Sequence, residues 1–351
     1  MSGPKIISVT AEPFDTPLHS PFVTSQGAAT AAKAVLVHIG LDDGSEATGE
    51  SVPVQYVTGE TIESVLATVA TVAPLIIGTP VSSYRAAARR IQLGAPNSPS
   101  ARCGLEMAVL DAFCANAGIS LHTLLGAAVP SIETDVTIPI VPNSGELAAA
   151  AWEIGIRIFK IKVGDANRAA DWKRIDDIRA AVPNARFRID ANQAYSPEEA
   201  IEFIHQLVAT GAEVELLEQP VAKEDFAGLG RVAEASPVPV FADESCRTRK
   251  DALTLVTTTA VHGLNLKINK NGLFGVLDII AIATAAGRKL MLGCMLETRR
   301  SIAVSAAIAC GTGAFQHIDL DSHLLLNEAL TEGEKGFVQQ GPVITPAETG
   351  L

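Results

Sequence analysis

From about residue 130 to residue 320 the sequence repeats one unit, a short apolar stretch followed by a segment long enough for a helix. Amphipathic segments such as 169–181 and 197–209 have this length, and the second opens with Ser196-Pro197, a typical helix start. The apolar stretches lie at residues 136–140, 156–163, 186–190, 214–218, 238–243, 263–268, 289–294 and 315–319. Apolar strands that alternate with helices are typical of parallel β/α units, and eight units fit a closed barrel. The sequence therefore predicts an α/β fold built on a (β/α)8-type barrel.

The first 120 residues or so follow a different pattern. Alternating stretches at 5–9, 33–40 and 47–52 predict strands, and the turn Asp42-Asp43-Gly44 joins the last two as a hairpin. Helical patterns follow at 60–72 and 98–117. We therefore expect an α+β capping domain at 1–125, the barrel at 126–325, and a C-terminal segment at 326–351 that returns to the capping domain.

Composition restricts the partners of this chain. Hydrophobic residues make up 48% of the 351 positions, enough for a large core, and the net charge is −12 without a basic cluster of the kind that binds nucleic acid or anionic lipid. The five cysteines include no CxxC pair, which argues against a disulfide framework or a zinc site. Because no run approaches the ~18 apolar residues of a membrane span, and the start lacks a signal-peptide pattern, we expect a cytoplasmic protein. We also expect it to form a homo-oligomer.

Ionisable side chains interrupt the predicted strands at a regular spacing. One stands at or next to the end of each of five consecutive strands: Lys162, Asp190, Glu218, Asp243 and Lys267. Each interval equals one β/α unit, so all five should lie at the carboxyl face of the barrel, where barrel enzymes build their active sites. Taken singly, each acid could be a cap or an ion-pair partner, and each lysine could reach solvent. It is the shared register that predicts a site.

The types of these residues indicate the chemistry. Three buried acids on neighbouring strands would repel one another without a cation between them. Oxygen ligands without histidine or cysteine suit Mg²⁺, so we predict one Mg²⁺ per subunit held by Asp190, Glu218 and Asp243. Strands two and six lie on opposite sides of a barrel mouth, so Lys162 and Lys267 would flank whatever the metal holds. That geometry suits removal of a proton from one face of a carbon and its return to the other.

Five short motifs surround these residues: Lys160-Ile161-Lys162-Val163-Gly164, Ile189-Asp190-Ala191-Asn192-Gln193, Glu218-Gln219-Pro220, Ala242-Asp243-Glu244-Ser245 and Lys267-Ile268-Asn269-Lys270. On these motifs the sequence resembles the enolase superfamily, in its muconate-lactonising subgroup, over most of its length. The resemblance implies a modified TIM barrel with a capping domain, the same three metal ligands, and Lys162 and Lys267 as acid/base catalysts. Lys160 would lie beside Lys162 and favour its free amine by like-charge repulsion. Asn192 could support the metal site, and Glu244 could orient a base or form an ordinary ion pair.

The end of the last predicted strand resembles dipeptide epimerases of this subgroup. Its pattern is Asp319-Leu320-Asp321, and period-2 alternation places both carboxylates on one side of the strand. There they can hold the α-ammonium group of a dipeptide, although a helix cap or a surface position is the alternative. The resemblance also implies that Thr137, Lys160, Cys294 and Met295 contact the substrate. The activity it implies is Mg²⁺-dependent inversion of the α-carbon of the dipeptide's C-terminal residue.

One departure bears on specificity. Members of the subgroup that act on Ala-Glu dipeptides look to carry an arginine in an N-terminal loop, where it binds the side-chain carboxylate. Here the loop contains Phe22, Val23 and Thr24, and Gly27 stands at the arginine position. The next cation, Lys33, belongs to the following predicted strand. We therefore predict a hydrophobic or small dipeptide as the substrate.

Other readings stay open at this point. Another reaction of the subgroup, such as that of an N-acylamino acid racemase, an o-succinylbenzoate synthase or a cycloisomerase, would use the same metal and lysines. The first two substrates carry no free ammonium group, so Asp319 and Asp321 argue against them. A non-catalytic barrel has little use for paired bases. A Schiff-base aldolase would have no use for three neighbouring acids.

Overall fold

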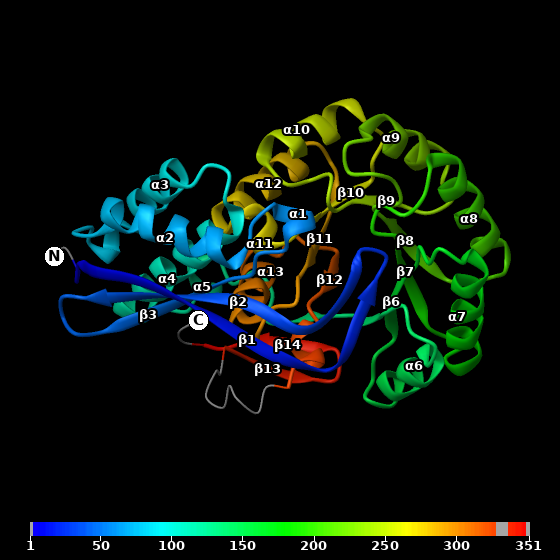
Figure 1. Cartoon of the computed structure of the whole chain (residues 1–351), viewed down its shortest axis with the longest axis horizontal. Coiled ribbons are helices and arrows are strands. Elements are labelled where there is room, and N and C mark those ends of the chain that lie inside the picture. The colour runs from blue at the N-terminus through cyan, green and yellow to red at the C-terminus, as the bar shows by residue number, and fades with distance from the viewer. Residues whose placement is uncertain (1–2, 328–335, 349–351) are drawn as a thin grey trace.

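The computed structural model describes residues 3–327 and 336–348 of the chain, and in that part the predicted barrel is confirmed. Eight parallel strands follow one another in sheet order, from β5 to β12 (Figure 1). The Asp135 amide donates to the Ile318 carbonyl at 3.3 Å, which brings the two ends of the sheet together and nearly closes the barrel. The strands are β5 (Val136–Ile138), β6 (Ile158–Lys162), β7 (Arg186–Asp190), β8 (Val214–Glu218), β9 (Val240–Ala242), β10 (Gly263–Leu266), β11 (Lys289–Gly293) and β12 (His317–Asp319).

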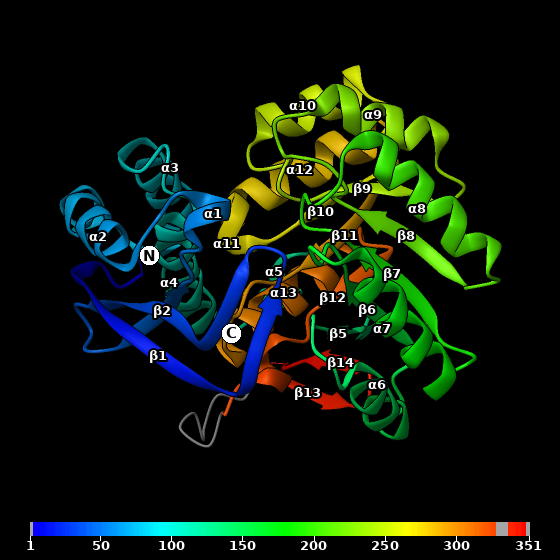
Figure 2. The same cartoon turned by 45° about the vertical axis from the view of Figure 1, so that its right-hand side comes forward.

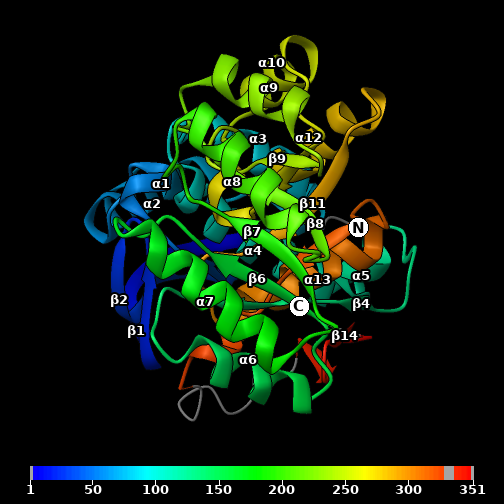
Figure 3. The same cartoon turned by 90° about the vertical axis from the view of Figure 1, so that its right-hand side faces the viewer.

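Helices cover the outside of this sheet (Figure 3). They are α6 (Ser144–Glu153), α7 (Arg168–Ala181), α8 (Pro197–Ala209), α9 (Phe226–Ala235), α10 (Arg249–Thr258), the short α11 (Ile268–Asn271), α12 (Leu273–Ala285) and α13 (Arg299–Thr312). The start predicted for α8 is confirmed by a capping box, in which Ser196 and Glu199 each bind the other's backbone amide. Buried aliphatic side chains between helices and strands form the main core.

The predicted sheet and helices of the N-terminal region are also present. Strands β1 (Ile6–Thr24), β2 (Gly27–Leu41) and β3 (Glu46–Ser51) form an antiparallel sheet. It packs against the helix α4 (Pro99–Ala117) so closely that a Cβ on Gly49 would lie 2.0 Å from the Gly104 carbonyl oxygen. The helices are α1 (Gln55–Thr58), α2 (Ile62–Ile76), α3 (Tyr84–Gly94), α4 (Pro99–Ala117) and α5 (Leu121–Leu124), with the 3₁₀ turn η1 (Val81–Ser83) before α3.

The first two strands are much longer than the alternation indicated. Residues 10–32, expected outside strands, form a hairpin arm that reaches the barrel mouth (Figure 2). Many of its residues are exposed on both faces, so it carries no clear two-residue period. The arm is held to the barrel domain by a bond from the Ile140 amide to the Val23 carbonyl, and to the C-terminal segment by a bond from the Asn327 amide to the Pro17 carbonyl.

The C-terminal segment contacts both parts of the chain. Leu326 forms a bridge with Leu18 in the hairpin arm. The strands β13 (Phe337–Gln340) and β14 (Val343–Pro346) instead lie against the barrel domain, where β14 pairs with β4 (Ile132–Glu133). The remaining residues of this segment, 328–335 and 349–351, lie outside the described part, so the predicted domain limits stay predictions. In the part that the structure describes, no helix is both long and apolar enough to span a membrane.

Candidate active site

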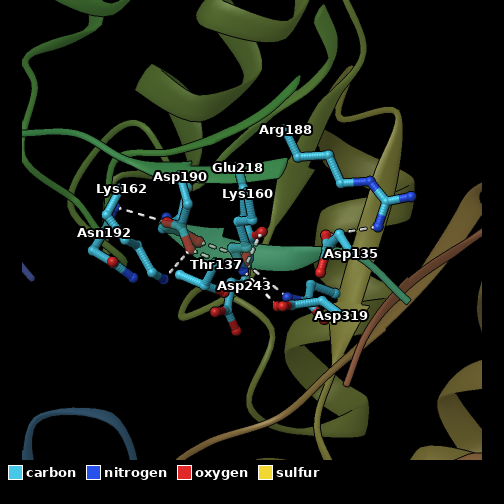
Figure 4. A network of polar contacts seen from close by, with 12 residues as sticks. Asp135, Thr137, Lys160, Lys162, Arg188, Asp190, Asn192, Glu218, Asp243 and Asp319 are labelled. Atoms are coloured by element: carbon cyan, nitrogen blue, oxygen red, sulfur yellow. Dashed lines mark hydrogen bonds and ion pairs between the residues drawn. The ribbon is translucent and has the colours of Figure 1, made fainter. Parts of the chain in front are cut away.

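Parallel register places the predicted ionisable residues side by side at one end of the barrel. Lys162 is paired with Asp190 across β6 and β7, and Asp190 with Glu218 across β7 and β8. Asp243 and Lys267, expected within strands, each stand one residue beyond β9 and β10, since the chain turns there. Lys162, Asp243 and Lys267 line a cavity of about 560 Å³, and Asp190 and Glu218 are fully buried beside it (Figure 4).

Each of the three acids has one carboxylate oxygen fixed by a rigid donor. The donors are a backbone amide, a buried side-chain amide and a buried ammonium group. The bonds run from Asn192 N to Asp190 Oδ1 at 2.9 Å, from Asn265 Nδ2 to Glu218 Oε1 at 2.7 Å, and from Lys270 Nζ to Asp243 Oδ1 at 2.6 Å. These contacts fix the direction in which the second oxygen of each acid points.

The second oxygens all face lysine ammonium groups. Asp190 Oδ2 lies 2.6 Å from Lys162 Nζ and 3.0 Å from Lys160 Nζ, Glu218 Oε2 lies 2.8 Å from Lys160 Nζ, and Asp243 Oδ2 lies 2.8 Å from Lys267 Nζ. Glu218 Oε2 is buried and has no hydrogen bond beyond this ion pair. Three carboxylate oxygens presented to positive charge are the donor set that Mg²⁺ prefers, so the residues fit the predicted metal.

Burial and neighbouring charges oppose each other in this cluster. Burial, together with the charge of Asp190, raises the pKa of Glu218 to about 7. Burial would also raise the pKa of Asp190, but Lys160 and Lys162 outweigh it and hold that pKa at about 2. Burial disfavours the ammonium form of Lys267, yet the contact with Asp243 raises the pKa of this lysine above its usual value. The ammonium groups thus take part of the role that a metal cation would have.

Lys160 and Lys162 share a partner in the acid cluster. Asp190 Oδ2 lies between the two ammonium groups and contacts both. The shared acid offsets the like-charge repulsion expected between the lysines, so the predicted effect of Lys160 on Lys162 stays a prediction.

A second acidic group lies across the cavity from Lys162. Asp319 and Asp321 are buried and line the cavity, as do Thr137, Cys294 and Met295. The Thr137 amide donates to Asp321 Oδ2 at 2.5 Å, and Cys294 Sγ lies 3.9 Å from Asp321 Oδ1. Burial and the charge of Asp319 raise the pKa of Asp321 to about 6. The structure thus brings together the residues predicted to contact the substrate.

Sequence reasoning missed a third acid in this group. Among the described residues, Asp135, Asp319 and Asp321 form the acidic cluster in which one oxygen from each carboxylate lies within 4.8 Å of the others. The three predicted metal ligands do not meet this distance. Asp135 precedes β5 and binds Arg188 Nη1 at 2.8 Å, and the same arginine also contacts Glu215 Oε2. The charged Arg188 within the apolar strand β7 was a sequence signal for such a partner, because a buried arginine needs an acid.

The predicted specificity loop is the tip of the hairpin arm. Phe22, Thr24 and Gly27 line the cavity, whereas Val23 is not among its lining residues and its carbonyl accepts the Ile140 amide. Lys33, set aside in the sequence because it lies on the next strand, also lines the cavity. The segment 52–57, which follows β3 and includes α1, forms another part of the wall that the sequence did not indicate.

The hairpin tip binds the loop that follows Asp190 at the end of β7. Gln26 Nε2 and Ser25 Oγ donate to the Asn192 carbonyl at 2.9 and 3.3 Å. Asn192 has a left-handed backbone, with φ of 40°, and its side chain donates to Glu244 Oε1 at 3.2 Å. Since the Asn192 amide also binds Asp190, one residue joins the hairpin tip to the acid cluster, which extends the supporting role predicted for Asn192.

Comparison with known proteins places this fold and site in a family. Residues 143–351 match the family described as enolase C-terminal domain-like, and residues 6–126 match the N-terminal domain of mandelate racemase / muconate lactonizing enzyme. The chain belongs to the enolase superfamily. Within it, both matches assign the chain to the mandelate racemase and muconate lactonizing branch.

Similar proteins have related names. An L-Ala-D/L-Glu epimerase from Thermotoga maritima is 38% identical, over 92% of this chain and 93% of that protein. An aromatic dipeptide epimerase from Herpetosiphon aurantiacus is 35% identical, over 98% and 96%. The solved dipeptide epimerase of Enterococcus faecalis V583, in complex with Mg and L-Leu-L-Tyr, has a TM-score of 0.93 and 31% identity, over 99% and 98% of the two chains. Members of this superfamily with different side-chain preferences thus share the fold of this chain.

The contact between hairpin tip and barrel predicts the effect of one substitution. Gln26→Ala removes the shorter of the two side-chain bonds to Asn192. A hydrogen bond contributes about 0.5–1.5 kcal/mol net, so amide exchange at residues 22–29 should become a few-fold to about tenfold faster. Hydrogen–deuterium exchange with mass spectrometry measures this. The control is His19→Ala, exposed on the same arm; equal protection in Gln26→Ala and the unmodified protein would contradict the assigned contact.

Proposed function

We propose that this chain is a Mg²⁺-dependent dipeptide epimerase that inverts the α-carbon of the dipeptide's C-terminal residue by transfer of a proton between two lysines. The observation that carries the proposal is the position of Lys162 and Lys267 at opposite ends of one row of acids. They extend from β6 and β10, four strands apart in an eight-stranded barrel. The names of the similar proteins support the same reaction. Cytoplasmic location and homo-oligomeric assembly stay predictions.

The metal role falls to Asp190, Glu218 and Asp243. Their second oxygens would hold one Mg²⁺ per subunit, while Asn192, Asn265 and Lys270 keep the first oxygens in place. When bound, the metal supplies positive charge where negative charge develops on the substrate's carboxylate oxygens.

The lysines supply the proton transfer. One must be an amine and accept the α-proton on one face, and the other must be an ammonium group and donate on the opposite face. Asp243 now stabilises the ammonium form of Lys267. Once Asp243 shares its charge with another cation, Lys267 loses part of this stabilisation and can release its proton more easily. The hairpin tip and segment 52–57 form part of the cavity wall beside these groups.

Asp319 and Asp321 would orient the other end of the dipeptide. Thr137 fixes one oxygen of Asp321, which leaves Oδ1 directed toward Cys294 and the cavity. A carboxylate pair so placed can accept hydrogen bonds from an α-ammonium group. With the carboxylate end directed to the site that Asp190, Glu218 and Asp243 would give to Mg²⁺, these two contacts would place the α-carbon between the lysines.

Each lysine should be necessary for the reaction. Lys162→Ala and Lys267→Ala should each lower the rate of epimerisation by about 10²–10⁴-fold or more, since each removes the proton donor or acceptor on one face. Proton NMR in D₂O measures this, because deuterium enters the α-position as the isomers interconvert. Lys173→Ala, on the exposed surface of α7, is the control. If only one lysine mattered, a cycloisomerase or a dehydratase-type reaction would be the better account.

A free ammonium group should be required. N-acetylation of a dipeptide substrate removes this charge and should lower kcat/KM about 10–100-fold, the value of one charge-assisted hydrogen bond. Asp321→Asn should reduce kcat/KM for the free dipeptide. The ratio of kcat/KM between the free and the N-acetylated dipeptide should therefore become smaller. A preference for the acetylated compound, with Asp321→Asn harmless, would indicate an N-acylamino acid racemase instead.

The cavity wall bears on the side chain that the enzyme accepts. Apolar residues contribute much of it, among them Phe22, Val54, Leu296 and Leu325, which supports the hydrophobic or small dipeptide proposed from the sequence. Lys33 in the same wall favours a second candidate, a dipeptide with an acidic side chain. Both candidate substrates would react with the same lysines and acids. They differ only in which residues of the cavity wall contact the side chain of the substrate.

A kinetic screen of a dipeptide library distinguishes these candidates. We expect the highest kcat/KM for hydrophobic or small side chains, because they bury apolar surface against the wall. In that case Lys33→Ala should change the ranking little. Highest kcat/KM for acidic side chains, lost in Lys33→Ala, would show that Lys33 has the role that arginine has in Ala-Glu epimerases.

A further inference from the structure

Lys160 contacts acids of both groups in the cavity. Its ammonium nitrogen lies 3.0 Å from Asp190 Oδ2, 2.8 Å from Glu218 Oε2 and 2.7 Å from Asp319 Oδ2 (Figure 4). The side chain is 1% exposed, so these contacts form in a region of low dielectric constant where they are strong. One cation therefore joins the acids proposed to hold the metal to an acid proposed to hold the ammonium group.

The partners of Lys160 differ in kind from those of the nearby Lys270. Lys270 Nζ donates to Asp243 Oδ1, and also to the carbonyl oxygens of Asp243 and Asn265, at 2.6–2.8 Å. Two of its three donors are thus held by backbone groups that cannot leave. The three contacts of Lys160 are all to carboxylates, two of which belong to the proposed metal ligands. A cation that binds Asp190 and Glu218 must therefore displace Lys160 from their oxygens. The same cation leaves two of the three Lys270 hydrogen bonds intact, because those bonds go to backbone carbonyls.

Charge counting indicates what this competition achieves. Asp135 pairs with Arg188, whereas Asp319 pairs with Lys160, so the charges that Lys160 helps to balance are those of Asp319 and its neighbour Asp321. When Asp190 and Glu218 are shared with a metal, Asp319 becomes the main partner of Lys160. Asp319 and Asp321, taken together with Lys160, then keep one net negative charge, which the single ammonium group of a dipeptide balances.

We propose that Lys160 is an internal counter-cation that competes with the metal for Asp190 and Glu218 and links their occupation to Asp319. The proposal rests on the proposed function for the identity of the metal site. Without metal, Lys160 reduces the mutual repulsion of the acids and stabilises the fold. With metal bound, Lys160 pairs mainly with Asp319. Its positive charge then sets the net charge of Asp319 and Asp321, the acids proposed to bind the substrate's ammonium group.

Metal affinity tests the competition directly. Mg²⁺ is titrated into the full chain by calorimetry without any dipeptide, so catalysis plays no part. Lys160→Met removes the competing charge and should bind Mg²⁺ about tenfold more tightly or better, the order expected for one charged contact. Its melting temperature should be lower than that of the unmodified protein in EDTA and should rise more on saturation with Mg²⁺. Equal or weaker affinity in Lys160→Met overturns the proposal. If the unmodified protein takes up no Mg²⁺, the proposed metal site fails first.

A pair of matched acid variants tests the link and leaves Lys160 in place. Asp319→Asn and Asp321→Asn each remove one negative charge from the same buried group, but only Asp319 contacts Lys160 in the structure. Asp319→Asn leaves Lys160 with Asp190 and Glu218 alone, so it should weaken Mg²⁺ binding several-fold more than Asp321→Asn does. In the Lys160→Met background this difference should disappear. Equal weakening by both variants with Lys160 present would rule out the link.

Discussion

Balance of buried charge governs the carboxyl end of this barrel. Asp190 and Glu218 are paired in strand register, Glu218 is paired with Phe241 on β9, and Asp243 stands just beyond the end of β9. Buried acids so close to one another are stable only next to cations. Lysines 160, 162, 267 and 270 supply them here, each in contact with at least one of these acids. The need of these buried acids for neighbouring cations is met by lysines in the structure. The proposed Mg²⁺ would meet the same need in place of some of the lysine contacts.

The capping domain contributes to this balance from outside the barrel. Glu60 accepts hydrogen bonds from the Ser100 and Ala101 amides at the start of α4. Ser100 in turn donates to the carbonyl of Asn269, two residues after Lys267. On the opposite side of the mouth, the hairpin tip binds Asn192, two residues after Asp190. The cap thus holds the chain directly after a proposed base and directly after a proposed metal ligand, so it shapes the reacting groups as well as the cavity wall.

The sequence predicted the barrel and its row of ionisable residues because both follow one period. An apolar strand buried on two faces leaves a clear pattern, and Asp190 or Lys162 stands out at its end. The hairpin arm was missed because its residues, such as His19, face solvent on both sides and leave no alternation. Asp135 and Gln26 were missed for another reason. Their partners, Arg188 and Asn192, lie far away in the sequence, and only the folded chain brings them together.

Chemistry and side-chain selection come from different parts of the fold. The groups proposed to react stand on β6 to β10 and in the residues that follow, where a change of charge would disturb every neighbour. Much of the wall next to the substrate comes from the hairpin tip and segment 52–57, whose residues can change without altering that balance. Solved relatives named with different dipeptides share this fold, with TM-scores of 0.93–0.94 at 31% identity. Variation in the cap, over a barrel whose charges are fixed, is a physical route by which one reaction can be directed to many substrates.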